Sequence, residues 1–292
     1  MIDKKRLIHI HHCRGIGWKG IKRFVSIDPE LKFIDDLTVN RLINDFGFKK
    51  SHAENFYHDL HTINSDKKVS DYANDGIHMI TLDDVNYPQH LKAIYDPPWV
   101  LYVKGNVQLL HRRLMLSVVG TRKPTRDGLT AMNLILQPLI DKSWTIVSGM
   151  ALGIDGAAHQ LALRSSTIAV LGSGLYHPYP KKHIALFNKM TNDHLVMSEY
   201  PPEQPPRQWQ FPERNRIISG LSLGTLVVEA REQSGSLITA DQALEQGREV
   251  FALPGNIFNE NTRGTHRLIQ QGAQLVTSAD DIIDILMGVN LL

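Results

Sequence analysis

Positively charged side chains follow a short apolar run that ends at a glycine near the middle of the chain. Residues 116–128 read LSVVGTRKPTRDG, so Gly120, Thr121, Arg122 and Lys123 come directly after β-branched residues. Open α/β sheets bind ligands at the carboxyl ends of their strands, and a glycine there lets the backbone approach a ligand closely. This turn predicts an anion site, although an ordinary turn with solvated cations would have the same composition.

A second turn combines glycines, tyrosines and lysines. Residues 171–183 read LGSGLYHPYPKKH, in which Tyr176 and Tyr179 could stack on a base or pack the loop. Glycines let backbone amides face an anion, and lysines supply charge. The residues that we expect to contribute here are Gly172, Gly174, Lys181 and Lys182.

Two further turns have the same character. Arg214 and Arg216 flank Asn215, which favours phosphate or carboxylate binding over a purely structural bridge between helix and loop. A strand-like run then leads into the triplet Ser234, Gly235 and Ser236, before a helix predicted over residues 237–246. Free amides and hydroxyls at a helix start suit a phosphate.

Several features that would indicate catalysis or a cofactor are weak. Asp155 and His159 lie four residues apart, and a helix cap with a packed histidine explains them better than a catalytic or metal half-site. Cys13 is the only cysteine and lies among His9, His11 and His12, but zinc sites usually contain spaced pairs of ligands. We therefore expect no metal and no cofactor.

The sequence does not support a dinucleotide-binding motif either. Residues 15–20 formally fit G-x-G-x-x-G, but no β-branched strand precedes them, and a turn between two short helices fits better. Such a turn could contact a DNA backbone or simply join the helices. The four anion-binding turns without a nucleophile and base favour binding over turnover, and their number of cations favours an extended polyanion such as single-stranded DNA.

The order of the predicted elements indicates how these turns meet. Strand-like runs begin near residues 116, 145, 167, 195, 225, 249 and 274, with helical stretches between most of them. Repeated βα units predict a mainly parallel, doubly wound sheet, so the turns after its strands share one edge. Pro138 lies inside the first of these helices and predicts a kink or a break there.

The first part of the chain differs from the rest in composition. Residues 1–70 hold 13 basic and 9 acidic side chains and read as short helices, whereas residues 71–110 hold 2 and 5. We therefore expect a helical domain over 1–70, a small β extension that leads into the sheet over 71–114, and a DNA-binding domain over 115–292. The chain has a net charge of +2, no apolar run long enough to cross a membrane and no signal peptide, so we expect a cytoplasmic protein without a membrane partner.

Several ordered motifs resemble those of the bacterial DNA-processing protein A family, also called DprA or Smf. They are VVGTR (118–122), SGMALGIDGAAH (148–159), YPK (179–181), FPERNRIISG (211–220), EAREQSGSLITA (229–240) and ALPG (252–255). The resemblance covers about residues 75–285. It implies a Rossmann-like fold, and the helices before it resemble the family's variable, often SAM-like, domain.

The resemblance also implies a function without catalysis. The family protects incoming single-stranded DNA during natural transformation and helps to load the RecA recombinase. By motif, Arg122 and Lys181 would line the DNA pocket, followed by Arg214 and Arg216. The family forms homodimers through the far end of this domain, where His266, Ile269 and Leu275 are candidates for the dimer and RecA surface. Many members continue into a winged-helix module, which we do not expect here because the chain ends soon after residues 280–286.

Two other functions are compatible with the same style of sheet. A nucleotide phosphoribohydrolase of the lysine-decarboxylase-like type would act on nucleoside monophosphates, but its P-G-G-x-G-T-x-x-E motif is not matched, since Pro254-Gly255 continues with Asn256, Ile257 and Phe258. A structural adaptor with an inert pocket would tolerate Arg122→Ala without loss of DNA affinity.

Overall fold

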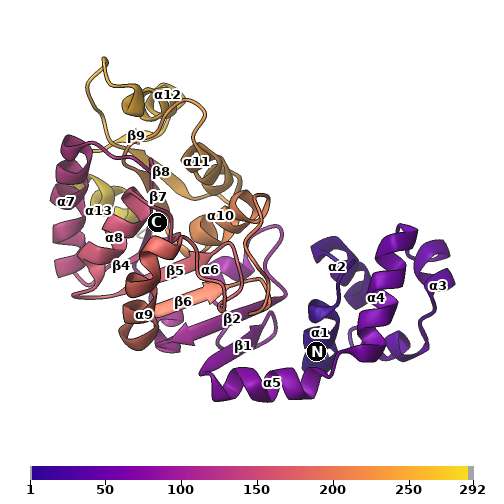
Figure 1. Cartoon of the computed structure of the whole chain (residues 1–292). Helices are drawn as coiled ribbons and strands as arrows, with labels where there is room; N and C mark the ends of the chain where they lie inside the picture. Colours follow the sequence, from indigo (N-terminus) through magenta and orange to yellow (C-terminus); the bar gives the residue numbers. More distant parts are fainter. Residues whose placement is uncertain (1, 289–292) are drawn as a thin grey trace. The chain divides into compact units, whose positions relative to one another are not determined.

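The computed structural model describes residues 2–288, and the chain divides into two compact units (Figure 1). Unit 1 contains the residues up to Tyr87 together with Asp96–Tyr102. Unit 2 contains Pro88–Tyr95 and the residues from Val103 onward. The predicted boundary at residue 70 lies within helix α5 (Ser65–Asn74) of unit 1.

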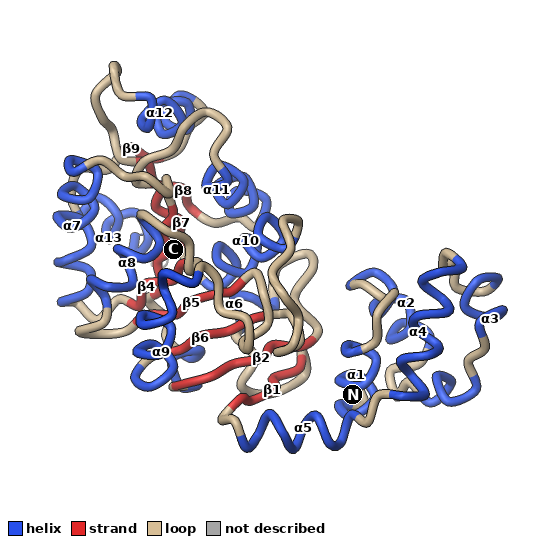
Figure 2. Tube along the Cα trace, in the orientation of Figure 1, coloured by secondary structure: helices blue, strands red, loops and turns tan. Residues whose placement is uncertain are grey.

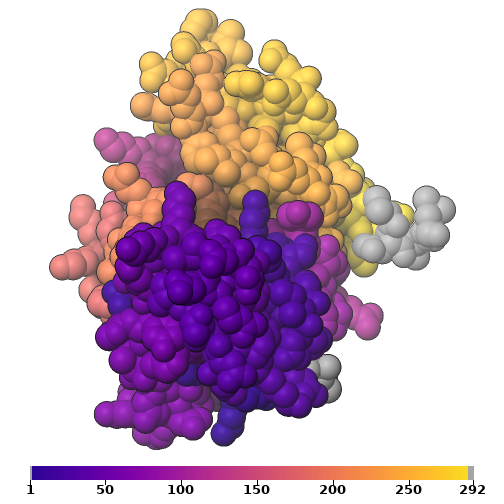
Figure 3. Space-filling view, turned by 90° about the vertical axis from the view of Figure 1, so that its right-hand side faces the viewer, coloured from indigo at the N-terminus to yellow at the C-terminus, as the bar shows by residue number. Residues whose placement is uncertain are grey.

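Unit 1 consists mainly of short helices. In addition to α5 they are α1 (Lys4–His12), α2 (Trp18–Ile27), the 3-10 helix η1 (Lys32–Asp36), α3 (Val39–Asn44) and α4 (Lys50–Thr62). Asp3, Thr38 and Asn64 each accept a bond from a first-turn amide, which explains where α1, α3 and α5 begin. The buried ring of Phe24 packs on four other phenylalanine rings at centroid distances of 4.8–6.0 Å. Figure 3 shows the surface of this unit in indigo to purple.

The strands form a nine-stranded sheet in the order β1-β2-β6-β5-β4-β3-β7-β8-β9. They are β1 (Ile77–Thr81), β2 (Val100–Gly105), β3 (Met115–Val119), β4 (Thr145–Ser148), β5 (Thr167–Leu171), β6 (Leu195–Ser198), β7 (Gly224–Val227), β8 (Glu249–Ala252) and β9 (Gln274–Leu275). The strands β3 to β9 pair in parallel, and Leu116 of β3 lies opposite Ile146 of β4 and Gly224 of β7. Every residue of β3, β4, β5, β6 and β7 is buried, which explains their continuous apolar runs.

The helices of unit 2 cover both faces of the sheet (Figure 2). One face is covered by α7 (Arg126–Asp141), α8 (Ile154–Ala162) and α13 (Ala279–Gly288), and the other by α10 (Gln210–Leu221) and α11 (Gly235–Glu245). The remaining helical segments are α6 (Gln89–Lys92), η2 (Val107–His111), η3 (Lys181–His183), α9 (Ile184–Asp193), η4 (Glu260–Thr262) and α12 (Arg263–Gln270). The predicted mixed α/β fold with a mainly parallel sheet and helices at the amino-terminal end is confirmed.

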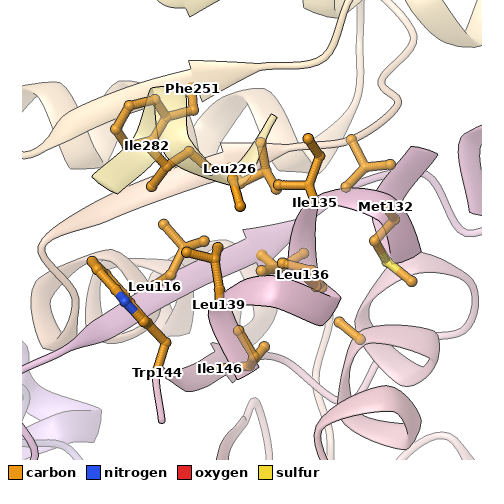
Figure 4. Packing of buried hydrophobic residues seen from close by; sticks show 14 of the residues in the cluster. Leu116, Met132, Ile135, Leu136, Leu139, Trp144, Ile146, Leu226, Phe251 and Ile282 are labelled. Carbon is orange, nitrogen blue, oxygen red and sulfur yellow. The ribbon is translucent and has the colours of Figure 1, made fainter. Parts of the chain in front are cut away.

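The core of unit 2 fixes the turn that follows β3. Leu116 of β3 packs with Leu136 and Leu139 of α7, and Leu226 of β7 and Ile282 of α13 complete the same apolar cluster (Figure 4). Burying a side chain of this size stabilises the fold by about 1.5–3 kcal/mol. This packing fixes α7 against β3, the two elements that the turn joins.

Of the kink or helix break predicted at Pro138, the break does not occur. Helix α7 continues through Pro138 to Asp141. The proline lies in the last turn, where its missing N–H removes one backbone hydrogen bond and the helix is about to end. Within residues 2–288, no helix is both long and apolar enough to cross a bilayer.

Candidate nucleic-acid interface

An open cleft of about 590 Å³ lies where β3 and β7 end side by side. Its walls come from the turn after β3, the start of α8, the first half of α10 and the loop between β7 and α11. The chain crosses from one face of the sheet to the other at this point, because α7 and α10 lie on opposite faces (Figure 2). Doubly wound sheets bind ligands at such a switch point.

The turn after β3 presents Arg122 to the cleft. The amide of Thr121 donates to the carbonyl of Glu229 at 2.7 Å, which ties the turn to the end of β7. Gly153 supports the turn from below with a φ of +82°, and a Cβ atom there would lie 2.3 Å from the carbonyl oxygen of Thr121. Only glycine fits this position, so the backbone of the 148–159 motif packs directly under Arg122.

Arg214 lies at the floor of the cleft and is buried together with Asp155. Its Nη1 donates to the carbonyl of Val170 at 2.7 Å, whereas its buried Nε has no partner in the part of the chain that the structure describes. A Cβ atom at Gly149 would lie 1.9 Å from Nη1 of Arg214 and 2.5 Å from Oδ2 of Asp155, so the two side chains lie beside each other over this glycine.

Burial acts on both of these charges. It raises the pKa of Asp155, which the positive charges of Arg214 and Arg122 partly offset. It lowers the pKa of Arg214, which the carboxylate of Asp155 partly offsets. A phosphate group in the cleft would add a second negative charge near the guanidinium of Arg214.

Arg216 is directed elsewhere. Its Nη2 donates to Oε1 of Glu199 at 2.7 Å, and the two side chains are only 6% and 11% exposed. Arg216 does not line the cleft, because it lies two positions after Arg214 on the same helix and therefore on a different face. The structure thus brings Arg122 and Arg214 together and separates Arg216 from them.

The loop between β7 and α11 forms the opposite wall. Ser234, Gly235 and Ser236 all line the cleft, and the hydroxyl of Ser234 caps α11 by accepting from the amide of Ser236 at 3.3 Å. Asn215 of α10 lines the cleft as well and donates to the carbonyl of Gly235 at 3.3 Å.

Aromatic residues close the end of the cleft near the second predicted turn. The rings of Tyr179 and Phe211 lie 5.5 Å apart, and a smaller pocket of about 50 Å³ opens beside them. Its wall includes Gly172, whose missing side chain makes room for Phe211. Gly174 is buried outside both pockets and its amide donates to the carbonyl of Gln204 at 2.8 Å.

The predicted lysines stand on the rim. Lys181 and Lys182 are exposed on η3, immediately after Tyr179 and Pro180. Lys123 is exposed next to Arg122, and its carbonyl accepts from Asn261 at 3.1 Å. These side chains can reach an anion that extends beyond the cleft, as the backbone of a nucleic acid does.

Sequence reasoning did not select Arg231, Gln208 or Phe211, which also line the cleft. Arg231 follows β7 at the same edge of the sheet as Arg122, so its position after a strand was a usable signal. Phe211 of α10 and Gln208, just before that helix, reach the cleft through the way α10 packs, for which the sequence carries no comparable signal.

Asp155 and His159 do not form a pair in the structure. Asp155 lies in the first turn of α8, while His159 is fully buried and its Nε2 donates to the carbonyl of Gly149 at 2.5 Å. Burial lowers the pKa of His159 to about 4. Within residues 2–288, no group of three or more His, Cys, Asp or Glu side chains is placed to hold a metal ion.

The residues predicted for the dimer and RecA surface lie on α12 and β9. Leu275 is 50% exposed on β9, which is an edge strand of the sheet. Ile269 and His266 are half-buried on α12, and Nε2 of His266 lies 3.1 Å from the carbonyl oxygen of Gly255.

Comparisons with known proteins agree on one family. The family model of DNA recombination-mediator protein A matches residues 78–287. DNA processing protein DprA of Bacillus subtilis is 46% identical over 237 residues, which are 80% of this chain and 78% of that protein.

Two solved structures are also similar. The DNA processing protein A structure from Streptococcus pneumoniae has a TM-score of 0.83 at 37% identity and covers 97% of this chain and 98% of its own. A Helicobacter pylori DNA processing protein A, described for its single-stranded DNA binding mode, has a TM-score of 0.65 at 30% identity, covering 72% of this chain and 96% of its own.

Proposed function

The chain belongs to the DNA recombination-mediator protein A family, and we propose that it binds single-stranded DNA in the cleft between the ends of β3 and β7 without catalysing a reaction. One observation carries this proposal: arginines from three separate segments, Arg122, Arg214 and Arg231, line one cleft beside the rings of Tyr179 and Phe211. The described DNA binding of the Helicobacter pylori relative supports it.

Different side chains of the cleft bind the phosphate backbone and the bases of a single strand. Guanidinium groups bind phosphate oxygens through two parallel hydrogen bonds, so Arg122 and Arg214 hold the backbone. Aromatic faces accept any base, so Tyr179 and Phe211 stack on bases without reading their sequence. Lys123, Lys181 and Lys182 bind the phosphates that lie beyond the cleft. Arg216 holds α10 to Glu199 and does not touch the DNA in this proposal.

We infer the cellular role from the family resemblance. The protein protects single-stranded DNA that enters the cytoplasm during natural transformation and loads the RecA recombinase onto it. It acts as a homodimer, with His266, Ile269 and Leu275 in the surface shared by the second copy and RecA. The exposure of Leu275 on an edge strand supports this assignment.

Salt dependence of binding tests the proposed DNA site. A labelled oligo-dT is titrated with the wild type, Arg122→Ala and Lys181→Ala at several salt concentrations, and binding is followed by fluorescence anisotropy. Each lost phosphate contact lowers the affinity and reduces the slope of log K against log salt by about 0.7. Arg112→Ala is the matched control. Arg112 is exposed just before β3 begins, so it lies near the amino-terminal end of this strand, whereas the cleft lies at the carboxyl end.

The outcomes separate the competing functions. Unchanged affinity and slope in both folded cleft variants would move the DNA site away from this cleft. No binding by the wild type, together with release of free base from a nucleoside monophosphate, would replace the proposal by a nucleotide phosphoribohydrolase.

A further inference from the structure

The loop between β8 and α12 ends in two exposed apolar side chains. Ile257 is 72% exposed and Phe258 is 88% exposed. No other large hydrophobic side chain within residues 2–288 is as exposed as Phe258. Figure 1 shows this loop projecting from the end of unit 2 that carries β8 and α12. This aromatic ring buries almost no surface in the fold, and loops often carry binding residues.

The tip is held in one conformation by its own hydrogen bonds. The amide of Phe258 donates to the side chain of Asn256 at 2.9 Å. The hydroxyl of Thr262 lies 2.7 Å from the carbonyl oxygen of Asn256 and 2.8 Å from that of Asn259, so it spans the two ends of the loop. The backbone of the tip therefore loses little conformational freedom when it meets a ligand.

The loop is also fastened to the rim of the cleft. Nδ2 of Asn259 lies 3.4 Å from the carboxylate of Glu229. The side chain of Asn261 donates to the carbonyl of Lys123 at 3.1 Å and accepts from Nε of Arg231 at the same distance. Since Arg231 lines the cleft, a strand that leaves the cleft past Arg231 and Lys123 meets this loop next.

The charges along this route suit a polyanion. Lys123, Arg231 and Arg263 are all exposed, and the amide of Gly264, next to Arg263, donates to the carbonyl of Ala230 at 2.8 Å. Glu260 lies 3.7 Å from Arg231, and both side chains of this pair are about two-thirds exposed. Such an exposed pair is weak and leaves Arg231 available to a phosphate.

We propose that Phe258 is a base-stacking residue that extends the path of single-stranded DNA beyond the cleft. The proposal rests on the proposed DNA binding, because it takes the same ligand along the rim. Phosphates follow Arg231 and Arg263, and the base that leaves the cleft stacks on the Phe258 ring. Gly255, at the start of the loop, contacts His266, which is predicted to lie in the dimer surface. A second copy of the chain is therefore the alternative ligand of this loop.

Length-dependent binding tests the proposal. Wild type, Phe258→Ala, Phe258→Trp and the control Val85→Ala, which truncates a side chain that is 86% exposed in unit 1, are titrated with a series of oligo-dT lengths. Phe258→Ala is expected to bind long oligonucleotides about five-fold more weakly, and those too short to leave the cleft as well as the wild type. Phe258→Trp should keep the affinity, and the salt slope should stay unchanged because stacking releases no counterions.

The result distinguishes this proposal from the proposed function. Equal binding of Phe258→Ala and wild type at every length, while Arg122→Ala loses affinity, would overturn the stacking role and leave the cleft intact. Conversion of Phe258→Ala from dimer to monomer in sedimentation velocity, with unchanged affinity per protomer, would assign the tip to the second copy. Failure of the wild type to bind DNA at all would overturn both proposals.

Discussion

At the scale of single residues, the buried pair of Arg214 and Asp155 connects stability with binding. Both side chains lie over Gly149, and Arg214 also bonds to the carbonyl of Val170. Removing Arg214 would take away a positive charge that offsets the burial of the Asp155 carboxylate, and losing the compensation of a buried charge typically costs about 3–5 kcal/mol. The same guanidinium is proposed to bind phosphate, so a single substitution would change both properties.

A pair of variants separates the two effects. Arg214→Met is expected to lower the free energy of unfolding by about 3–5 kcal/mol and to weaken DNA binding. Adding Asp155→Asn removes the uncompensated carboxylate, so the double variant should regain most of the stability and none of the DNA affinity. Urea unfolding and anisotropy titration measure the two quantities. Recovery of full DNA affinity in the double variant would show that Arg214 acts only through Asp155.

The sequence indicated where Arg122 lies, but not that Arg214 and Arg216 point to different places. Arg122 follows a buried strand, so its place at the ligand-binding edge was predictable from the strand alone. Arg214 and Arg216 were treated as equivalent because both flank Asn215 in a segment expected near a connection. They lie instead inside α10, where residues two apart point about 200° away from each other, so one reaches the cleft and the other reaches Glu199.

At the scale of elements, the start of α7 depends on the carboxylate of Glu229, which lies just after β7. Thr125 caps α7 by accepting from the amide of Gly128 at 3.0 Å. Its own hydroxyl and amide donate to the carboxylate of Glu229 at 2.6 and 2.9 Å. Glu229 is buried, and its negative charge lies near the amino-terminal end of α7, which the helix dipole favours. This contact sets the far end of the turn that carries Arg122.

Substitution of Thr125 tests this coupling. Thr125→Val keeps the side-chain shape but removes the hydroxyl, and is expected to lower the free energy of unfolding by about 2 kcal/mol. It should also weaken DNA binding and speed hydrogen exchange over residues 121–128, because the turn loses one of its two supports. Thr125→Ser keeps the hydroxyl and serves as the matched control. Equal exchange rates in the two variants would contradict the coupling.

The elements themselves were largely predictable. Strands buried on both faces must be short apolar runs, so β3, β4, β5 and β6 begin within one residue of the positions expected from sequence. The continuation of α7 past Pro138 was not predictable, because the sequence does not show whether a proline lies in the last turn of a helix or in its middle. The contact of Glu229 with Thr125 joins residues 104 positions apart, and local patterns carry no information about it.

At the scale of the whole molecule, each unit contains a histidine that hydrogen-bonds in its neutral form, half-buried in unit 1 and fully buried in unit 2. In unit 1, His11 lies 3.1 Å from the hydroxyl of Tyr102, and burial together with the charge of His12 lowers the pKa of His11 to about 3. In unit 2, burial lowers the pKa of His159 to about 4, despite its bond to Gly149. An unfolded chain restores both to about 6.5.

These shifts predict that acid weakens both units well above the pH at which carboxylates titrate. Below pH 6.5 these two histidines bind protons in the unfolded chain but stay neutral in the folded chain, so the free energy of unfolding falls as the pH falls. Each histidine contributes about 1.4 kcal/mol per pH unit until its folded pKa of about 3 or 4 is reached. Urea-dependent hydrogen exchange read by mass spectrometry at pH 7, 6 and 5, corrected for the intrinsic exchange rate, follows peptides from α1 and α8 separately.

His159→Gln assigns the effect to one unit. The variant is expected to be less stable at pH 7, but the stability of α8 should then vary less with pH than in the wild type, while that of α1 keeps its slope. His177→Gln is the control, because His177 is exposed in the same unit. Parallel pH profiles for α8 in wild type and His159→Gln would rule out His159 as the source. A smaller slope in α1 as well would instead mean that the two units unfold as one cooperative body, so that a proton bound in either unit destabilises both.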